Sequence, residues 1–547
     1  MKNYPGIKKI FPYLKKHKFS IIVFFMISII LGFISTLPVL FLGNTIDMIV
    51  NPNSTKGFLS EIMAEINNVY LLFIIIGVLL IISELSNSLF GYFVSNFGIK
   101  IKSEIKKDIL KNIIRNYNPV YSELKEGDIL TRISKDIDAV NQVIVAPING
   151  LVRDFINLFW VVCVFMIWNW EIALVSMMLM LPVYFVSKRI GKSTKEFSGR
   201  INKIEDDVNN YSLSIVKNLK LVHLLRTHDY EIQKSATFIN KTEKQTKKLN
   251  KILSFLFPLV GIIKVIGIIS VLCLTYYFIF RGKLTIGAIT IAYIYVRKLY
   301  SPLVGFSRYS RTFAAADKSL SRVFELKELQ SFQYSEDGTK IKRPPEIVIS
   351  DVDFEYENKK IYELFNTIIK ANEITVLKSK SGKGKTTLLN LLIGLVDPSS
   401  GKIKINGLDN KQIDFSSASI LFQEALLFNR TLKENIIYGN DNYSQDKFEV
   451  LLDKLSLREF YIKNGPDYVI DSNNQNISGG ERRRICLFRA LLKDSFLYIL
   501  DEPTSELDKE ISEKIIGYIN SLKGKATFVI STHDDVFTPI ADSIIDI

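Results

Sequence analysis

A loop rich in glycine, serine and lysine stands out in the C-terminal half of the 547-residue chain. The stretch SKSGKGKTT (379–387) follows the apolar run EITVLK and precedes the helix-forming run TTLLNLLIGL. In such a strand–loop–helix setting, glycines let backbone amides curl round a phosphate, and the helix N-terminus adds partial positive charge. Lys385 is expected to reach the β- and γ-phosphates of a nucleotide, and the Thr386 hydroxyl to hold Mg²⁺. The predicted phosphate-binding residues are Ser379, which replaces the usual first glycine, and Ser381, Gly382, Lys383, Gly384, Lys385, Thr386 and Thr387.

A second motif expected at the nucleotide site is the run FLYILDEP, an apolar strand that ends in two carboxylates. Asp501 is expected to bind Mg²⁺, because hard cations prefer oxygen ligands. Glu502 is placed to polarise a water that attacks the terminal phosphate. The phosphate-binding loop alone would leave kinases, GTPases and helicases open as protein classes.

The stretch ISGGERRR (477–484) narrows the choice, because it resembles the signature motif of ABC ATPases, with Ile for Leu and Glu for Gln. The resemblance implies a second anion site at the start of a helix, which clamps the γ-phosphate bound by the opposite subunit. Its expected residues are Ser478, Gly479, Gly480 and Glu481.

Further motifs occur in the order found in the ABC family. Gln423 in ILFQEALLF is similar to the Q-loop glutamine, and SELD (505–508) is similar to the D-loop. His533 in VISTHDD is similar to the switch histidine, and Tyr356 in FEYENKK to the aromatic residue that stacks on adenine. The resemblance implies catalytic roles for Glu502, His533 and Gln423, and it makes Gln423 a third Mg²⁺ ligand beside Thr386 and Asp501.

The charge of the chain divides at about residue 340. The formal net charge is +14, and 43 of the 70 basic residues but only 25 of the 56 acidic ones precede residue 341. The positive charge therefore accompanies the hydrophobic half, as membrane topology requires, and no nucleic-acid partner is expected.

Six apolar stretches are predicted to cross a membrane, because about 20 residues are needed to span the hydrocarbon. They run over residues 19–42, 69–98, 147–168, 172–186, 252–280 and 284–304. Six lysines and no acidic residue precede the first stretch, which places the N-terminus in the cytoplasm. The polar segments 99–146 and 187–251 have helical periodicity, so the second to fifth helices are expected to continue into the cytoplasm. Within these segments, 122–140 resembles the first intracellular loop of ABC exporters.

The predicted fold is thus an α-helical six-span membrane domain of the ABC exporter type (1–330) joined to an α/β P-loop ABC ATPase domain (345–547). The resemblance covers essentially the whole chain. It implies ATP and Mg²⁺ as cofactors and a second half-transporter as partner, either an identical copy or a different one. It also implies that the fourth and fifth helices are exchanged between subunits. The expected location is the bacterial plasma membrane, with the ATPase domain in the cytoplasm.

Six charged residues fall inside the predicted spans, at about the same depth in the inner-leaflet half. Charges there are costly and usually face water, a partner or cargo. One hypothesis is mutual neutralisation, with Glu84 of one chain near Lys264 of the other. The other is a cavity for cargo that carries a carboxylate or phosphate. The candidate cavity residues are Glu84, Arg153, Asp154, Lys264, Arg297 and Lys298.

The leading functional hypothesis is an ATP-driven exporter that works by alternating access. A peptide, such as a bacteriocin, or an amphipathic small molecule is the expected cargo. One alternative is a flippase or exporter of lipids or lipophilic drugs, and another is an ATP-gated channel or sensor that does not pump. Stimulation of ATP hydrolysis by cargo separates a pump from a sensor.

Overall fold

The computed structural model describes residues 4–50, 68–115, 126–328, 338–356, 359–379, 384–440, 442–471 and 476–547. The chain divides into two compact units. The first, the membrane unit, comprises Met1–Arg115 and Leu124–Leu329. The second, the nucleotide unit, comprises Gln330–Ile547.

The membrane unit is helical throughout its described parts. Its helices are α1 (Pro5–Lys8), α2 (Phe11–Lys16), α3 (Lys18–Ile34), α4 (Leu37–Val50), α6 (Val69–Arg115), α8 (Glu126–Ser134), α9 (Ala139–Pro147), α10 (Arg153–Trp168), α11 (Trp170–Met178), α12 (Met180–Lys217), α13 (Leu219–Leu224), α14 (His228–Phe280), α15 (Gly287–Leu299) and α16 (Ser301–Glu328). A 3₁₀ turn, Asp136–Asp138, precedes α9, and a π-helical turn, Ile148–Val152, joins α9 to α10.

Five helical segments in the described residues are long and apolar enough to cross a membrane. They are Lys18–Val50, Val69–Arg115, Gly127–Trp168, Trp170–Lys217 and His228–Phe280. They contain the first five predicted spans. The sixth predicted stretch, 284–304, contains α15, which has 13 residues before a turn at Tyr300, after which α16 continues. The number of six spans stays a prediction.

The first span is broken where the sequence suggested one continuous helix. The hydroxyls of Ser35 and Thr36 donate to the carbonyls of Gly32 and Phe33, at 2.8 and 2.7 Å. Pro38 follows, and proline has no N–H to offer the preceding turn. Helix α3 therefore ends at Ile34, and α4 begins at Leu37.

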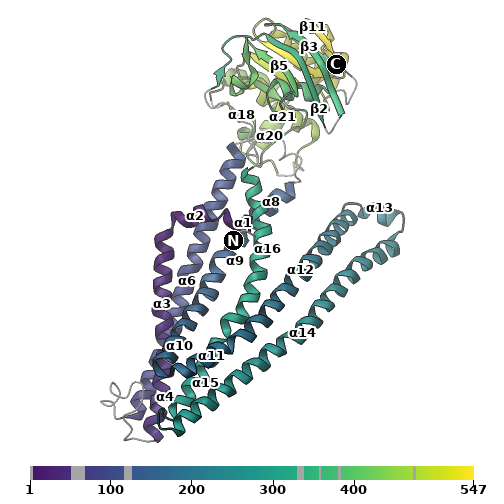
Figure 1. Ribbon diagram of the computed structural model, residues 1–547. Helices are drawn as coiled ribbons and strands as arrows, with labels where there is room; N and C mark the ends of the chain where they lie inside the picture. The colour runs from purple at the N-terminus through teal and green to yellow at the C-terminus, as the bar shows by residue number, and fades with distance from the viewer. Residues whose placement is uncertain are drawn as a thin grey trace. The chain divides into compact units, whose positions relative to one another are not determined.

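Two helices of the membrane unit are much longer than a bilayer requires, and their continuation into the cytoplasm stays a prediction. At 1.5 Å per residue, the 47 residues of α6 and the 53 of α14 are more than twice the length that the hydrocarbon core requires. Helices α12 and α14 lie side by side, and the short helix α13 follows α12 at the turn between them (Figure 1).

The nucleotide unit contains a parallel sheet and an antiparallel sheet. The parallel sheet has the strand order β11-β4-β10-β9-β8, and the antiparallel one β3-β2-β5-β6. The strands are β2 (Ile347–Tyr356), β3 (Lys359–Ile369), β4 (Ile374–Lys378), β5 (Ser400–Ile405), β6 (Leu408–Asp409), β8 (Ser419–Leu421), β9 (Leu497–Asp501), β10 (Thr527–Thr532) and β11 (Ser543–Asp546). A separate pair joins β1 (Thr339–Lys340) to β7 (Ile413–Asp414).

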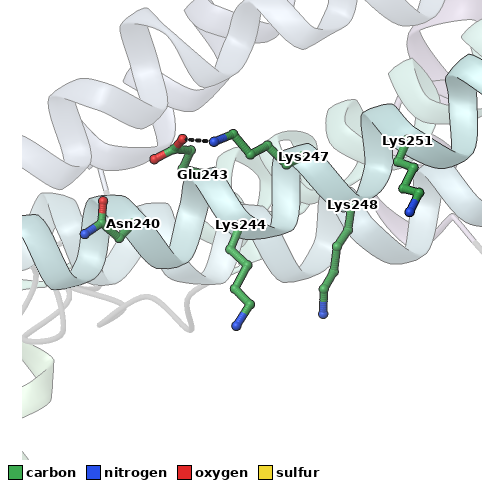
Figure 2. Close-up of a pocket in the computed structure, with 6 residues that line it drawn as sticks. All are labelled: Asn240, Glu243, Lys244, Lys247, Lys248 and Lys251. Carbon is green, nitrogen blue, oxygen red and sulfur yellow. Dashed lines mark ion pairs between the residues drawn. The ribbon is translucent and has the colours of Figure 1, made fainter.

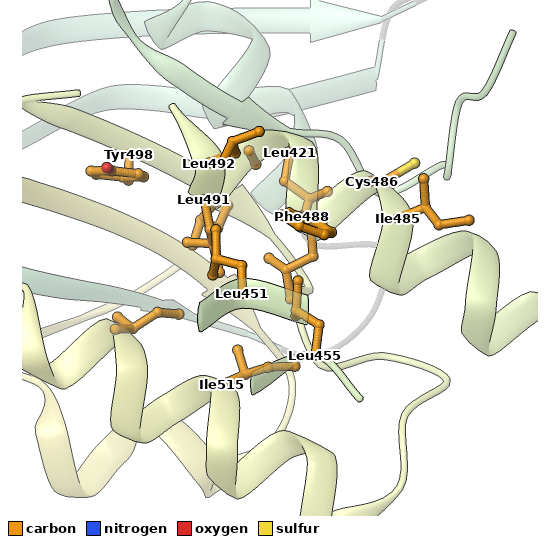
Figure 3. Close-up of a cluster of buried hydrophobic side chains, with 14 of the residues drawn as sticks. Leu421, Leu451, Leu455, Ile485, Cys486, Phe488, Leu491, Leu492, Tyr498 and Ile515 are labelled. Carbon is orange, nitrogen blue, oxygen red and sulfur yellow. The ribbon is translucent and has the colours of Figure 1, made fainter. Parts of the chain in front are cut away.

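The main helices of this unit are α17 (Lys385–Leu392), α18 (Leu432–Ile437), α19 (Gln445–Lys454), α20 (Arg458–Asn464), α21 (Gly479–Leu492) and α22 (Lys509–Ser521). Helix α21 lies in the middle of a large apolar core, where Ile485, Phe488 and Leu491 are buried with Leu451 (Figure 3). The rings of Phe448 and Phe488 have centroids 4.8 Å apart. This core fixes α21 beside the parallel sheet and so determines where its polar residues lie.

Candidate functional site

Four neighbouring strands of the parallel sheet, β4, β10, β9 and β8, bring the predicted catalytic residues to one edge. Strand β10 pairs with both β4 and β9, and Ser531 lies opposite Asp501. The carboxyl ends of parallel strands face the same edge, where α/β proteins bind their ligands. The loop after β4, the carboxylates after β9 and His533 after β10 therefore converge.

The phosphate-binding loop is described at both of its ends, whereas Ser381, Gly382 and Lys383 lie outside the described residues. Gly384 has φ +110°, a left-handed conformation that favours glycine. The Tyr362 hydroxyl donates to the Gly384 carbonyl at 2.8 Å, a support that the motif did not reveal. The Lys385 ammonium is buried and donates to the Ser379 carbonyl at 3.1 Å. The Lys385 side chain thus points back toward the loop that is expected to bind the phosphates.

Oxygen atoms from three segments gather around Thr386. Its hydroxyl lies 2.8 Å from an Asp501 carboxylate oxygen and 3.4 Å from the Gln423 side-chain oxygen. Asp501 is buried, and burial raises the pKa of its carboxyl. A hydroxyl, an amide oxygen and a carboxylate form the kind of oxygen donor set that Mg²⁺ accepts. The three predicted Mg²⁺ ligands are therefore adjacent, and a cation bound between them would offset the negative charge of the buried Asp501 carboxylate.

Glu502 lies between two nitrogen-bearing side chains. One carboxylate oxygen is 3.9 Å from the Lys385 ammonium and 3.3 Å from Nδ1 of His533. The Glu502 side chain is largely buried, whereas the side chain of His533 is half exposed. A carboxylate with a lysine on one side and a histidine on the other can accept and pass on a proton at the phosphate site.

The signature segment begins α21 with a reciprocal cap. The Glu481 amide donates to the Ser478 hydroxyl at 3.2 Å, and the Ser478 amide donates to the Glu481 carboxylate at 2.8 Å. Such a capping box satisfies two of the free amides at a helix start. The Glu506 carboxylate lies so close to Gly479 that a Cβ added to this glycine would be 2.9 Å from a carboxylate oxygen. Ser478 is exposed, so the start of α21 is accessible to another molecule.

Sequence reasoning missed Arg483, the largest fully buried side chain among the described residues. It lies on the face of α21 that also buries Leu487 and Ala490. A charged residue four and seven positions from buried apolar ones was a signal that could have been noticed. The backbone of Tyr356 belongs to β2, but its side chain lies outside the described residues.

A groove rich in lysine runs along α14 just before the apolar stretch of that helix. Its lining residues are Asn240, Glu243, Lys244, Lys247, Lys248 and Lys251 (Figure 2). Glu243 and Lys247 form an ion pair, while Lys244 and Lys248 extend to the other side of the helix. Dense lysines beside an apolar run are typical of the cytoplasmic end of a span.

The predicted intramembrane charges have different surroundings. The Lys298 ammonium donates to the Ser35 carbonyl at 3.0 Å, and the Tyr295 hydroxyl donates to the Thr36 carbonyl at 2.8 Å. Both carbonyls lie at the break between α3 and α4. Helix α15 thus satisfies polar groups at this break, which gives Lys298 a structural task in the described chain.

The other candidate cavity residues are less enclosed. Glu84, Arg153 and Arg297 are exposed in the single chain, and Lys264 is half-buried. The Arg297 guanidinium lies over the Tyr293 ring, 5.6 Å from its centroid. The carboxylate of the sixth residue, Asp154, lies beside Gly305 of α16.

Comparison with known proteins gives the same architecture. The family model described as ABC transporter transmembrane region matches residues 21–303, and the one described as ABC transporter matches residues 363–505. Proteins named ATP-dependent lipid A-core flippase are similar. The one from Desulfotalea psychrophila is 26% identical over 74% of this chain and 72% of its own length. The one from Vibrio vulnificus (strain YJ016) is 26% identical over 76% and 72%.

A solved structure, that of a bacterial Atm1-family ABC exporter with ATP bound, superimposes with a TM-score of 0.79. It covers 98% of this chain and 93% of its own, at 19% sequence identity. This likeness shows the fold.

Proposed function

Because this chain belongs to the ABC transporter family and is a multi-pass exporter whose ATPase domain couples ATP hydrolysis to transport, we propose that two copies move an amphipathic anionic molecule out of the cytoplasm. The observation that carries the proposal is the set of basic side chains in the membrane unit. Arg153 and Arg297 are exposed inside predicted spans. A charge in the hydrocarbon costs insertion free energy, which reaches about 2.5–3.5 kcal/mol at mid-membrane on insertion scales. Anionic cargo would offset that cost.

In the proposed ATP site, Lys385 and the amides of the loop would hold the phosphates, and Thr386, Gln423 and Asp501 would hold Mg²⁺. Bound Mg²⁺ would neutralise charge that develops on the phosphates. Glu502 accepts a proton from the attacking water, and His533, at 3.3 Å, orients this carboxylate. The exposed start of α21 binds the γ-phosphate of the nucleotide held by the other subunit.

A lipid with a phosphorylated headgroup is the cargo class that we place first. The curated relatives reported above are named as lipid flippases. The peptide cargo predicted from the sequence is the second candidate, since a free C-terminal carboxylate would meet the same arginines. Export proceeds from the cytoplasmic side of the bacterial plasma membrane, and the lysine-rich groove of α14 supports that orientation.

Arg297→Gln offers a test with a matched control. Arg297 lies over the ring of Tyr293, and Arg281 lies in the same way over the ring of Tyr277, so each arginine covers the tyrosine four residues before it. Arg281 differs in position, because it lies at the end of α14, outside the apolar run. We expect Arg297→Gln to slow ATP-dependent flipping of fluorescent phosphatidylglycerol in phosphatidylcholine vesicles, while Arg281→Gln behaves as wild type. Basal ATP hydrolysis should persist in both.

Two further arms identify the cargo class. An amphipathic peptide with a free C-terminus, compared with its amidated form, tests the peptide alternative. If wild-type protein moves the peptide and not the lipid, the lipid assignment is wrong. If Arg281→Gln impairs transport as much as Arg297→Gln does, the basic residues do not form a cargo site.

A further inference from the structure

We propose that Arg483 is a positioning residue that holds the catalytic glutamate and the Q-loop glutamine in register by binding the backbone of both. The inference rests on the proposed role of Glu502. Arg483 touches neither the predicted phosphate site nor its cation ligands through their side chains. It acts through the main chain that carries them.

The guanidinium of Arg483 donates to four backbone carbonyls from two segments. One nitrogen donates to the carbonyls of Phe422 and Gln423, at 2.7 and 2.8 Å. The other donates to the carbonyls of Asp501 and Glu502, the latter at 2.6 Å. A planar guanidinium has its donors in a fixed fork, so it sets the separation of the two segments as well as binding them. Both segments carry residues that converge on Thr386.

The conformation of Glu502 makes such support necessary. Its φ is +46°, in the left-handed region that a glutamate rarely adopts. Its amide donates to the Ser531 carbonyl at 2.8 Å, and its carbonyl accepts from Arg483. The backbone of Glu502 is therefore held on one side by β10 and on the other by α21. Removing Arg483 frees one of these sides and lets the carboxylate move relative to the phosphates.

Neighbouring arginines on α21 show what a purely structural role looks like. Arg489 donates to the carbonyls of Asn435 and Leu426, at 2.8 and 2.9 Å. Like Arg483, it is largely enclosed and donates to main-chain carbonyls of two segments. However, neither Asn435 nor Leu426, whose carbonyls accept from Arg489, is a predicted catalytic residue. Arg489→Met is therefore a matched control for Arg483→Met.

The test compares steady-state kinetics of ATP hydrolysis and thermal stability for the full-length protein in detergent or vesicles. We expect Arg483→Met to lower kcat by about 10²-fold, since a misplacement of about 1 Å can have that effect. The KM for ATP should stay near the wild-type value, because the phosphate-binding loop is unchanged. Arg483→Lys keeps the positive charge but can reach fewer carbonyls, so its kcat should lie between those of the wild type and Arg483→Met. Arg489→Met should lower the melting temperature but leave kcat per folded molecule near wild type.

Several outcomes would overturn the inference. The inference is wrong if kcat of Arg483→Met falls no more than that of Arg489→Met, or if the loss lies mainly in KM. If Arg483→Met does not fold, Arg483→Lys decides, and a wild-type kcat in that variant leaves only a structural role. Glu502→Gln is measured in parallel. Wild-type turnover there would refute the role of Glu502 itself, whereas an inactive Glu502→Gln beside an active Arg483→Met refutes this inference alone.

Discussion

The nucleotide unit and the membrane unit both place charged side chains among apolar residues, but they surround these charges differently. In the nucleotide unit, Arg483 and Lys385 are buried, and backbone carbonyls of the same chain accept their hydrogen bonds. In the membrane unit, Lys298 is bound to a carbonyl, whereas Glu84 and Arg297 are exposed in the single chain. Charges of the first kind have their partners within one chain. Glu84 and Arg297 instead expose their charges to lipid, water, cargo or a second copy.

The largest expected effect concerns a charge whose surroundings are complete in one chain. Glu502→Gln should lower the rate of ATP hydrolysis by about 10²–10⁴-fold, the usual contribution of a general base. ATP binding should persist, because Lys385 and Gly384 are unchanged. Turnover and nucleotide affinity of the purified protein measure both quantities. A mutant that hydrolyses ATP at the wild-type rate would show that another group acts as the base.

A second prediction tests whether the nucleotide unit is complete by itself. Ser478→Arg should abolish hydrolysis in homodimers, because the exposed start of α21 is proposed to serve ATP held by the other subunit. ATP affinity should remain. Mixing Ser478→Arg subunits with Lys385→Ala subunits should restore part of the activity, since each mixed dimer retains one intact composite site. Full activity in pure Ser478→Arg dimers would contradict the role across the subunit interface.

A third prediction concerns Asp501, whose pKa is raised by burial. In the absence of Mg²⁺, the folded state therefore binds a proton more tightly than the unfolded state, and stability falls as the pH rises through the folded pKa. Asp501→Asn should remove this pH dependence and raise the melting temperature at neutral pH by about 2–4 °C for each kcal/mol gained. Differential scanning calorimetry without nucleotide measures the shift.

The same variant provides a check on the cation. Asp501→Asn should abolish the Mg²⁺-dependent part of ATP binding, because the buried carboxylate is gone. Unchanged Mg²⁺ dependence would remove Asp501 from the predicted ligands. A lower melting temperature would show that the carboxylate is stabilised by groups other than Thr386.

The smallest expected effect lies in the membrane unit. If Glu84 of one copy faces Lys264 of the other, a double-mutant cycle with Glu84→Gln and Lys264→Gln should show a coupling of about 0.6 kcal/mol, the average for polar contacts between membrane helices. Thermal stability of the dimer in vesicles supplies the four values. Additive effects would exclude the pair and leave both charges to lipid, water or cargo.

Much of this architecture could be predicted from the sequence because its signals are local. The five long apolar helices and the β4–loop–α17 arrangement follow from runs of consecutive residues. The break at Ser35 and Thr36 was missed, since it depends on side chains that bond back to the preceding turn. Arg483 was missed because its four partners lie 18 to 61 positions away in the sequence. Only the folded sheet brings these segments together.

The left-handed backbone at Glu502 has a consequence for how the protein tolerates change. A non-glycine residue in this region costs about 1–3 kcal/mol, whereas glycine adopts it readily. Glu502→Gly would therefore relieve strain while removing the proposed base. Random mutation followed by selection for folding alone should enrich inactive chains at this position, and only selection for turnover would retain the glutamate. At this residue, activity and folding stability are in conflict, which is a trade-off that evolution must resolve in favour of activity.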